Sequence, residues 1–203
     1  MGKTWIVLTE RDYRSSCWSG GTTTQIAIAP RDASYGQRDF LWRISSAAVE
    51  QEQSTFTSLP DYDRLLATLE GEIQLEHAGG GSTLLKPLQI HAFDGADPTV
   101  SCGRCRDFNL MLRKGRAKGE MKALRLRHAA EILPGDPRGG DQLLFCASGT
   151  VSVTDGERAV PLSPGESLLT EAASSLQLTA GEEETVLLCC RMRICDNPEK
   201  GKS

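Results

Sequence analysis

An arginine on an apolar strand is the residue best suited to chemistry in this sequence. Side chains alternate between the two faces of the strand expected at Phe40–Ser45, so Leu41, Arg43 and Ser45 share one face. The planar guanidinium of Arg43 presents a fork of N–H donors that matches a carboxylate. The pattern predicts an anion-binding pocket at Arg43 and Ser45, and the alternative that both side chains face solvent stays open.

Two further polar residues, Ser58 and Asn109, are candidates for the same pocket. Their hydroxyl and amide groups suit a small acid, and Asn109 alternates with apolar neighbours in a way that gives its strand one polar face. Three aromatic residues are expected in the core rather than stacked on a ligand: Trp18, Trp42 and Phe93.

An internal repeat in the sequence predicts different roles for Asp63 and its neighbour Arg64. The segment Asp63–Leu75 lines up with Asp141–Val153 at a constant offset, with the Asp, a Leu-Leu pair and a Gly identical in both copies. The recurring Asp favours a turn-capping role. Arg64 is not repeated, because Gln142 takes its place, so Arg64 remains a candidate ligand-binding residue. A period this long indicates a duplicated domain.

Short apolar runs broken by Gly, Pro, Asp and Ser predict an all-β protein. One short helix is expected near Ala47–Gln53. The repeat favours a bicupin, with two cupin-like jelly-roll β-barrel halves at residues 1–115 and 116–203. A single β-sandwich with chance similarity is the alternative. The clearest strands are Gln25–Ala29, Phe40–Ser45, Leu65–Leu75, Phe108–Leu112, Leu143–Val153 and Val186–Ile194.

The histidines that metal-binding cupins use are missing from the expected motifs. Such proteins need two His at positions i and i+2, a nearby Glu and a later third His. Here Pro60–Arg64 contains no His, and Leu168 stands at the late His position. The three histidines, His77, His91 and His128, are expected far apart on the surface or in loops. We therefore expect no metal and no cofactor.

The sequence contains few motifs that would indicate nucleophilic or acid–base catalysis. Cys102 and Cys105 form a CxxC pair without a second pair or His partners, which favours ordinary thiols over a zinc or redox site. No recognisable nucleophile motif surrounds any Ser or Cys. His91 with Asp94 is the one local pair that a metal-independent isomerase or hydrolase could use.

Four segments, in order along the chain, resemble the HutD/Ves family. They cover the first half of the chain and include the Arg43 strand, the Arg64 segment and the Asn109 segment. These segments are Trp18–Ala27, Phe40–Ala47, Phe56–Arg64 with the following Leu69–Gly71, and Arg106–Met111 with Arg113 and Gly115.

The resemblance implies a bacterial two-cupin protein. Family members are associated with histidine utilisation, as proposed regulators, or with stress-inducible proteins. The resemblance also favours a pocket role for Arg43. This chain departs from the family pattern at three positions: Gln25 stands where Glu is common, Asp61 where Gly is common, and Ala96 interrupts a Phe-x-Gly-Asp motif.

Composition and charge exclude several classes of protein. The chain has 203 residues, 39% hydrophobic and 25% charged, as in an ordinary globular protein. A net charge of −4 argues against nucleic acid as a partner. No apolar run approaches the length of a membrane span or a signal-peptide core, so we expect a cytoplasmic protein. A homodimer stays open.

Together these patterns predict a binding protein rather than an enzyme. The expected ligand is a small metabolite, anionic and carboxylate-bearing, held without metal, and the expected role is regulation or sensing. The alternatives are a metal-independent isomerase or hydrolase acting on a similar metabolite, and an interaction protein whose barrels contain no pocket.

Overall fold

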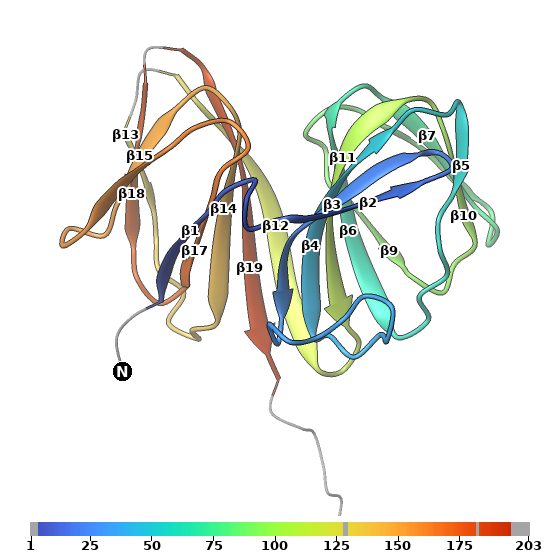
Figure 1. The fold of residues 1–203 in the computed structure, drawn as a ribbon, viewed down its shortest axis with the longest axis horizontal. Coiled ribbons are helices and arrows are strands. Elements are labelled where there is room, and N and C mark those ends of the chain that lie inside the picture. The colour runs from blue at the N-terminus through green and yellow to red at the C-terminus, as the bar shows by residue number, and fades with distance from the viewer. Residues whose placement is uncertain (1–3, 128–129, 182, 196–203) are drawn as a thin grey trace, which may run out of the picture. The chain divides into compact units, whose positions relative to one another are not determined.

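The computed structural model describes residues 4–127, 130–181 and 183–195, and every regular element in those ranges is a β-strand. The chain divides into two compact units (Figure 1). The N-terminal unit comprises Tyr13–Lys118 with Ile194–Ser203, and the C-terminal unit comprises Met1–Asp12 with Gly119–Arg193. The described residues include no helix long and apolar enough to span a membrane.

The N-terminal unit contains two antiparallel sheets. One has six strands in the order β2-β3-β4-β11-β6-β9, and the other has four in the order β5-β10-β7-β8. The strand bounds are β2 Arg14–Trp18, β3 Gly21–Ala29, β4 Trp42–Val49, β5 Gln53–Thr55, β6 Tyr62–Glu70, β7 Ile73–His77, β8 Gly81–Leu85, β9 His91–Asp94, β10 Thr99–Cys102 and β11 Cys105–Arg113.

The C-terminal unit also contains two sheets. Its five-stranded sheet has the order β1-β17-β14-β19-β12, and its four-stranded sheet has the order β13-β18-β15-β16. The strand bounds are β1 Trp5–Leu8, β12 Ala117–Leu126, β13 Ala130–Leu133, β14 Asp141–Ser148, β15 Val151–Thr154, β16 Ala159–Leu162, β17 Ser167–Glu171, β18 Leu176–Ala180 and β19 Thr185–Ile194.

The two units repeat one topology. The run β4-β11-β6-β9 corresponds to β12-β19-β14-β17, and β5-β10-β7-β8 corresponds to β13-β18-β15-β16. The repeated glycines occupy equivalent bends after β6 and β14: Gly71 has φ 76° and Gly149 has φ 71°. A Cβ at Gly71 would lie 2.4 Å from the carbonyl oxygen of Arg104, so both conformation and space require glycine there. The predicted all-β bicupin fold with two cupin-like halves is confirmed.

Strand β1, although it is the first in the sequence, belongs to the C-terminal unit. Strand β1 pairs with β17, with Trp5 opposite Thr170 and Leu8 opposite Ser167. The division therefore differs from the expected halves 1–115 and 116–203, because residues 1–12 join the C-terminal unit. The pairing covers an edge that β17 would otherwise expose.

The expected helix near Ala47–Gln53 is absent. Strand β4 continues through Val49, and β5 begins at Gln53. Strand β4 pairs on one side with β3 and on the other with β11. These two ladders of backbone hydrogen bonds outweigh the weak helical preference of an Ala-containing segment.

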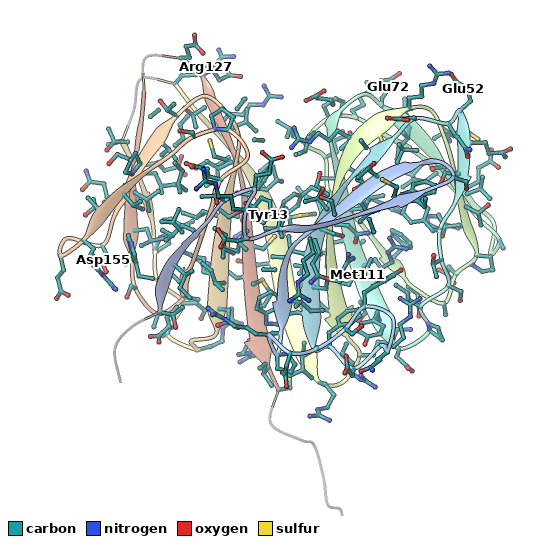
Figure 2. All side chains as sticks on the ribbon, viewed as in Figure 1. Tyr13, Glu52, Glu72, Met111, Arg127 and Asp155 are labelled. Atoms are coloured by element: carbon teal, nitrogen blue, oxygen red, sulfur yellow. The ribbon has the colours of Figure 1, made fainter. Side chains whose placement is uncertain are left out.

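Side chains fill the space between the sheets of each unit (Figure 2), but with different chemistry. In the C-terminal unit, the central pair β14 and β19 places apolar Cys146 opposite Leu187, and Leu144 opposite Cys189, within the core. The equivalent pairs of β6 and β11 are Thr68 opposite Asp107, and Leu66 opposite Asn109. At these two central pairs the N-terminal unit therefore places Thr68, Asp107 and Asn109 where the C-terminal unit has apolar side chains.

Candidate functional site

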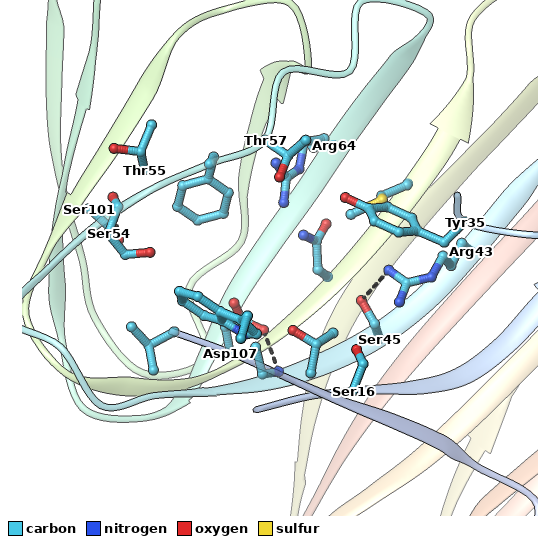
Figure 3. Close-up of a pocket in the computed structure, with 17 residues that line it drawn as sticks. Ser16, Tyr35, Arg43, Ser45, Ser54, Thr55, Thr57, Arg64, Ser101 and Asp107 are labelled. Atoms are coloured by element: carbon cyan, nitrogen blue, oxygen red, sulfur yellow. Dashed lines mark hydrogen bonds between the residues drawn. The ribbon is translucent and has the colours of Figure 1, made fainter. Parts of the chain in front are cut away.

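A cavity of about 290 Å³ opens inside the N-terminal unit (Figure 3). Strands β4, β6 and β11 supply its charged and amide side chains, and the segment from Ser54 to Thr57 supplies hydroxyls and the Phe56 ring. Its lining residues are Ser16, Trp18, Thr23, Tyr35, Arg43, Ser45, Ala47, Val49, Ser54, Thr55, Phe56, Thr57, Arg64, Ser101, Asp107, Asn109 and Met111.

The register of three adjacent strands explains how these side chains meet. Met111 of β11 lies opposite Arg43 of β4 on one side and opposite Arg64 of β6 on the other. Two residues along β11, Asn109 lies opposite Ser45. Because side chains two residues apart share a face, these rows present their side chains to the same interior.

Arg43 is held by neutral partners. It is only 5% exposed. Its Nε donates to Oε1 of Gln25 at 2.8 Å, its Nη1 donates to Oγ of Ser45 at 3.0 Å, and its Cζ lies 4.4 Å from the ring centre of Tyr35. Burial lowers the pKa of Arg43 to about 10, although the charges of Tyr35 and Asp107 act in the opposite direction.

Arg64 is equally buried and has fewer partners. It is 5% exposed, and its Nε makes no hydrogen bond within the described part of the chain. Its Cζ lies 4.5 Å from the ring centre of Phe56 and 5.2 Å from that of Phe93, so aromatic faces flank the cation. Burial lowers the pKa of Arg64 to about 10.

Asp107 is the one carboxylate in the lining. Its Oδ1 accepts a hydrogen bond from the backbone N–H of Ala47 at 2.8 Å. Burial raises the pKa of Asp107 to about 6, against the Ala47 hydrogen bond and the charges of Arg64 and Arg43, which lower it. Asp107 forms no ion pair with either arginine among the described contacts. The lining thus combines two buried guanidiniums with one buried carboxylate that is not ion-paired to either of them among the described contacts.

Residues 10–188 match the family model described as HutD. The chain belongs to the HutD family. Protein Ves of Escherichia fergusonii is 34% identical over 107 residues, a match that spans 50% of this chain and 53% of Ves. The chain therefore matches about half the length of this curated relative.

Solved structures are similar to this HutD-family chain over nearly its whole length. A conserved protein from Pseudomonas aeruginosa is 26% identical with a TM-score of 0.80, covering 93% of this chain and 98% of that one. HutD from Pseudomonas fluorescens is 24% identical with a TM-score of 0.71, covering 94% and 100%. Oxalate decarboxylase from Lactobacillus farciminis, at 7% identity and a TM-score of 0.68, shares the fold over 92% and 85% of the two chains.

Four of the five candidates from the sequence line this cavity: Arg43, Ser45, Arg64 and Asn109. The fifth candidate, Ser58, is exposed and lies outside the lining of this cavity. The buried position of Trp42, at 2% exposure, is confirmed. The expectation for Trp18 was wrong, because Trp18 is 39% exposed and lines the cavity.

Sequence reasoning missed Tyr35, Phe56 and Asp107. Tyr35 lies in the loop between β3 and β4, where no periodicity marks an inward side chain. Burial would raise the pKa of Tyr35, but hydrogen bonds from Arg38 and Thr57 and nearby positive charges outweigh it and lower the pKa. Asp107 could have been found, because it shares a face with Asn109 on the same strand.

Two histidines expected far apart are in contact. Nε2 of His77 and Nε2 of His91 lie 2.9 Å apart, with ring centres separated by 5.1 Å. The hydroxyl of Thr99 donates to the carbonyl of Asp97, so it accepts from Nδ1–H of His77 at 2.9 Å. Nε2 of His77 then accepts the hydrogen bond that Nε2–H of His91 donates. His128 lies outside the described residues.

The other candidate groups for chemistry are occupied or buried. Asp94, the proposed acid–base partner of His91, instead pairs with Lys114 and accepts from the backbone N–H of Ala96. Burial raises the pKa of Cys105 to about 12, which keeps its thiol protonated and unreactive. In the described ranges, no three His, Cys, Asp or Glu side chains cluster as a metal site would require.

Proposed function

We propose that this protein binds a small carboxylate metabolite in the cavity of its N-terminal unit, without a metal, and serves a regulatory or sensing role. The observation that carries the proposal is the pair Arg43 and Arg64, each 5% exposed and neither ion-paired among the described residues. A buried cation without an anionic partner costs several kcal/mol, which a bound carboxylate would offset.

The chemistry around the arginines supports a carboxylate in particular. Hydroxyls of Ser45, Ser54 and Thr57 line the same cavity, and hydroxyl donors with a planar guanidinium suit two carboxylate oxygens. The cavity volume lies near the lower end of the range for small-molecule sites, which favours a metabolite over a peptide.

A sensing role rests on two further points. The HutD/Ves resemblance is to proteins proposed as regulators, and the lining contains no His, Cys, Lys or Glu. A site rich in donors and poor in proton acceptors favours holding an anion over transforming it.

Asp107 keeps a second function open, a metal-independent isomerase or hydrolase. A carboxyl group in the cavity with its pKa raised to about 6 is poised to exchange protons near neutral pH. In that function Asp107 would act as the general base, and Arg43 and Arg64 would hold the substrate acid.

Thermal-shift measurements with matched acid and amide pairs test the first proposal. Formate, acetate and glutarate should raise the unfolding temperature, whereas formamide, acetamide and glutaramide should not. Incubation of stabilising acids with stoichiometric protein, followed by NMR, then separates binding from turnover. Persistence of the acid for hours supports a binding protein. Conversion that Asp107→Asn abolishes supports the enzyme, and stabilisation by the amides alone contradicts carboxylate binding.

A further inference from the structure

We propose that His77 and His91 form a pH-operated latch, which joins the two sheets of the N-terminal unit and holds the ring of Phe93 beside Arg64. The latch is closed while the two facing nitrogens share one proton, and it opens when both imidazoles are protonated. The latch itself does not depend on the proposed carboxylate-binding function. Only its effect on the cavity rests on that function.

The two histidines connect strands of different sheets. His77 ends β7 in the four-stranded sheet, and His91 begins β9 at the edge of the six-stranded sheet. Their ring centres lie 5.1 Å apart but their Nε2 atoms only 2.9 Å, so each imidazole points its Nε2 at the other. In the described part of the chain no backbone ladder joins β7 to β9, so this side-chain contact is a direct link between the two sheets.

The C-terminal unit has the equivalent strands without a latch. Leu168 of β17 lies opposite Leu144 as His91 of β9 lies opposite Leu66, and Leu66 and Leu144 are equivalent in the repeat. Leu168 is fully buried and carries no ionisable group. Strands β15 and β17 therefore provide an internal reference for the behaviour of β7 and β9.

The hydrogen bonds of the neutral pair leave one nitrogen open to a proton. Nδ1–H of His77 donates to Oγ1 of Thr99, and Nε2–H of His91 donates to Nε2 of His77. Nδ1 of His91 makes no hydrogen bond to another described residue, so a first proton binds there and leaves the contact between the imidazoles intact. A second proton has to bind Nε2 of His77. Two N–H groups then face each other, and the contact is lost.

Among the described residues, no carboxylate forms an ion pair with either imidazole. The ionisable residues on the elements packed against the pair are Asp63 and Arg64 on β6, Glu76 on β7, Asp94 on β9, Cys102 on β10, and Lys86 and Asp97 in the segments that precede β9 and β10. Asp94 pairs with Lys114 instead. Burial, and then the charge of His77, lower the pKa of His91, so protonation requires a pH below the ordinary His value of about 6.5.

Phe93 connects the latch to the cavity. Its ring centre lies 5.2 Å from the ring centre of His77 and 5.6 Å from that of His91. Phe93 lies opposite Arg64 in the register of β6 and β9, with its ring centre 5.2 Å from Cζ of Arg64. When the imidazoles separate, Phe93 loses the two rings packed against it. Of its two described aromatic neighbours, Arg64 then keeps only Phe56, and the anion site at Arg64 is less well ordered.

NMR of the imidazole nitrogens tests the latch directly in the full-length protein. At pH 7.5 the shared proton should reside on Nε2 of His91, with a scalar coupling across the hydrogen bond to Nε2 of His77. On acidification the pair should titrate in two separate steps below about pH 6.5, as coupled groups do. The coupling should survive the first step and disappear in the second. Independent titration of each imidazole at its ordinary pKa, without a coupling, would overturn the latch.

Hydrogen exchange measures the opening of the strands. Amide protection factors, which are corrected for the intrinsic effect of pH, should fall about tenfold or more in β7 and β9 between pH 7.5 and pH 4.5, and should stay unchanged in β15 and β17. His91→Gln should keep β9 protected at both values, because an amide donates to neutral His77 and accepts from protonated His77. His77→Gln is the reciprocal variant, used if His91→Gln does not fold. An equal fall in wild type and variant would show that the latch does not hold the strands.

Calorimetric titration with formate measures the effect on the cavity. Formate affinity should fall several-fold more in wild type than in His91→Gln between the same two pH values. Changes caused by Asp107 or by formate itself are common to both proteins and cancel in this comparison. An equal fall in both proteins overturns the coupling through Phe93. Absence of formate binding at either pH overturns the proposed function, while the NMR and exchange results still decide the latch.

Discussion

The Nε atom of Arg43 donates its hydrogen bond to a neutral acceptor, Oε1 of Gln25, at 2.8 Å. A glutamate at that position would form an ion pair with the guanidinium and compete with any incoming anion. The neutral amide instead orients the arginine while leaving its positive charge available. Gln25 is also a position at which this chain departs from the HutD/Ves pattern.

Gln25→Glu should therefore weaken carboxylate binding about tenfold or more, because the new carboxylate neutralises Arg43 from within. Calorimetry with glutarate measures the effect. Gln89→Glu is the control, since it adds the same charge at an exposed position outside the cavity. Unchanged affinity in Gln25→Glu would show that the charge of Arg43 does not contribute to binding.

The raised pKa of Asp107 predicts that the folded state loses stability as the pH rises. Its folded pKa, about 6, lies above the ordinary 3.8, so the folded state holds the proton more tightly and stability falls as pH rises through this window. Asp107→Asn keeps an acceptor for Ala47 and removes the buried charge. The variant should be more stable than the wild type by about 1–3 kcal/mol at pH 8 and nearly equal at pH 4.

Urea unfolding at the two pH values measures this difference. Asp97→Asn, at an exposed Asp outside the cavity, is a control that should show no such dependence. A variant less stable than the wild type at pH 8 would mean that the Asp107 charge is compensated by the arginines.

Only part of this site could be predicted from the sequence. Alternation placed Arg43 and Ser45 on one face of their strand, but both faces of β4 are buried, since Trp42 is 2% and Ile44 0% exposed. Periodicity therefore could not distinguish the cavity face from the opposite face. The HutD/Ves resemblance supplied the preference for a pocket.

What sequence reasoning missed depends on contacts between distant segments. His77 and His91 belong to β7 and β9, which lie in different sheets, and local sequence carries no signal that two sheets will face each other there. Tyr35 enters the site from a loop. Ser58 was predicted from its hydroxyl alone, and the chain turns it outward. Tertiary packing determines each of these outcomes.

The histidine pair predicts a second pH effect, opposite in sign. Burial, and then the charge of His77, lower the pKa of His91, so the unfolded state binds its proton more readily. Stability should fall as pH drops from about 7 through the ordinary His pKa of about 6.5. His91→Gln should reduce this loss between pH 7.5 and pH 5.0, measured by urea unfolding. An identical pH dependence in wild type and variant would contradict the assignment.

The protein should be purified free of metal. Leu168 stands at the late cupin His position, and burial keeps the Cys105 thiol protonated. Elemental analysis after purification without added metal should find well under one equivalent of zinc, iron, manganese or nickel. A stoichiometric metal that Cys102→Ser and Cys105→Ser remove would contradict this account of the cysteines.

The central claim is that buried Arg43 binds a carboxylate, and calorimetric titration of wild type, Arg43→Ala and Arg43→Lys tests it most directly. The titrant is the acid that gives the largest thermal shift. Arg43→Ala should weaken binding by roughly ten- to a hundredfold, and Arg43→Lys should not restore it, because an ammonium cannot reproduce the bidentate fork. Equal affinity in wild type and Arg43→Ala would contradict the claim, and full affinity in Arg43→Lys would contradict its bidentate geometry.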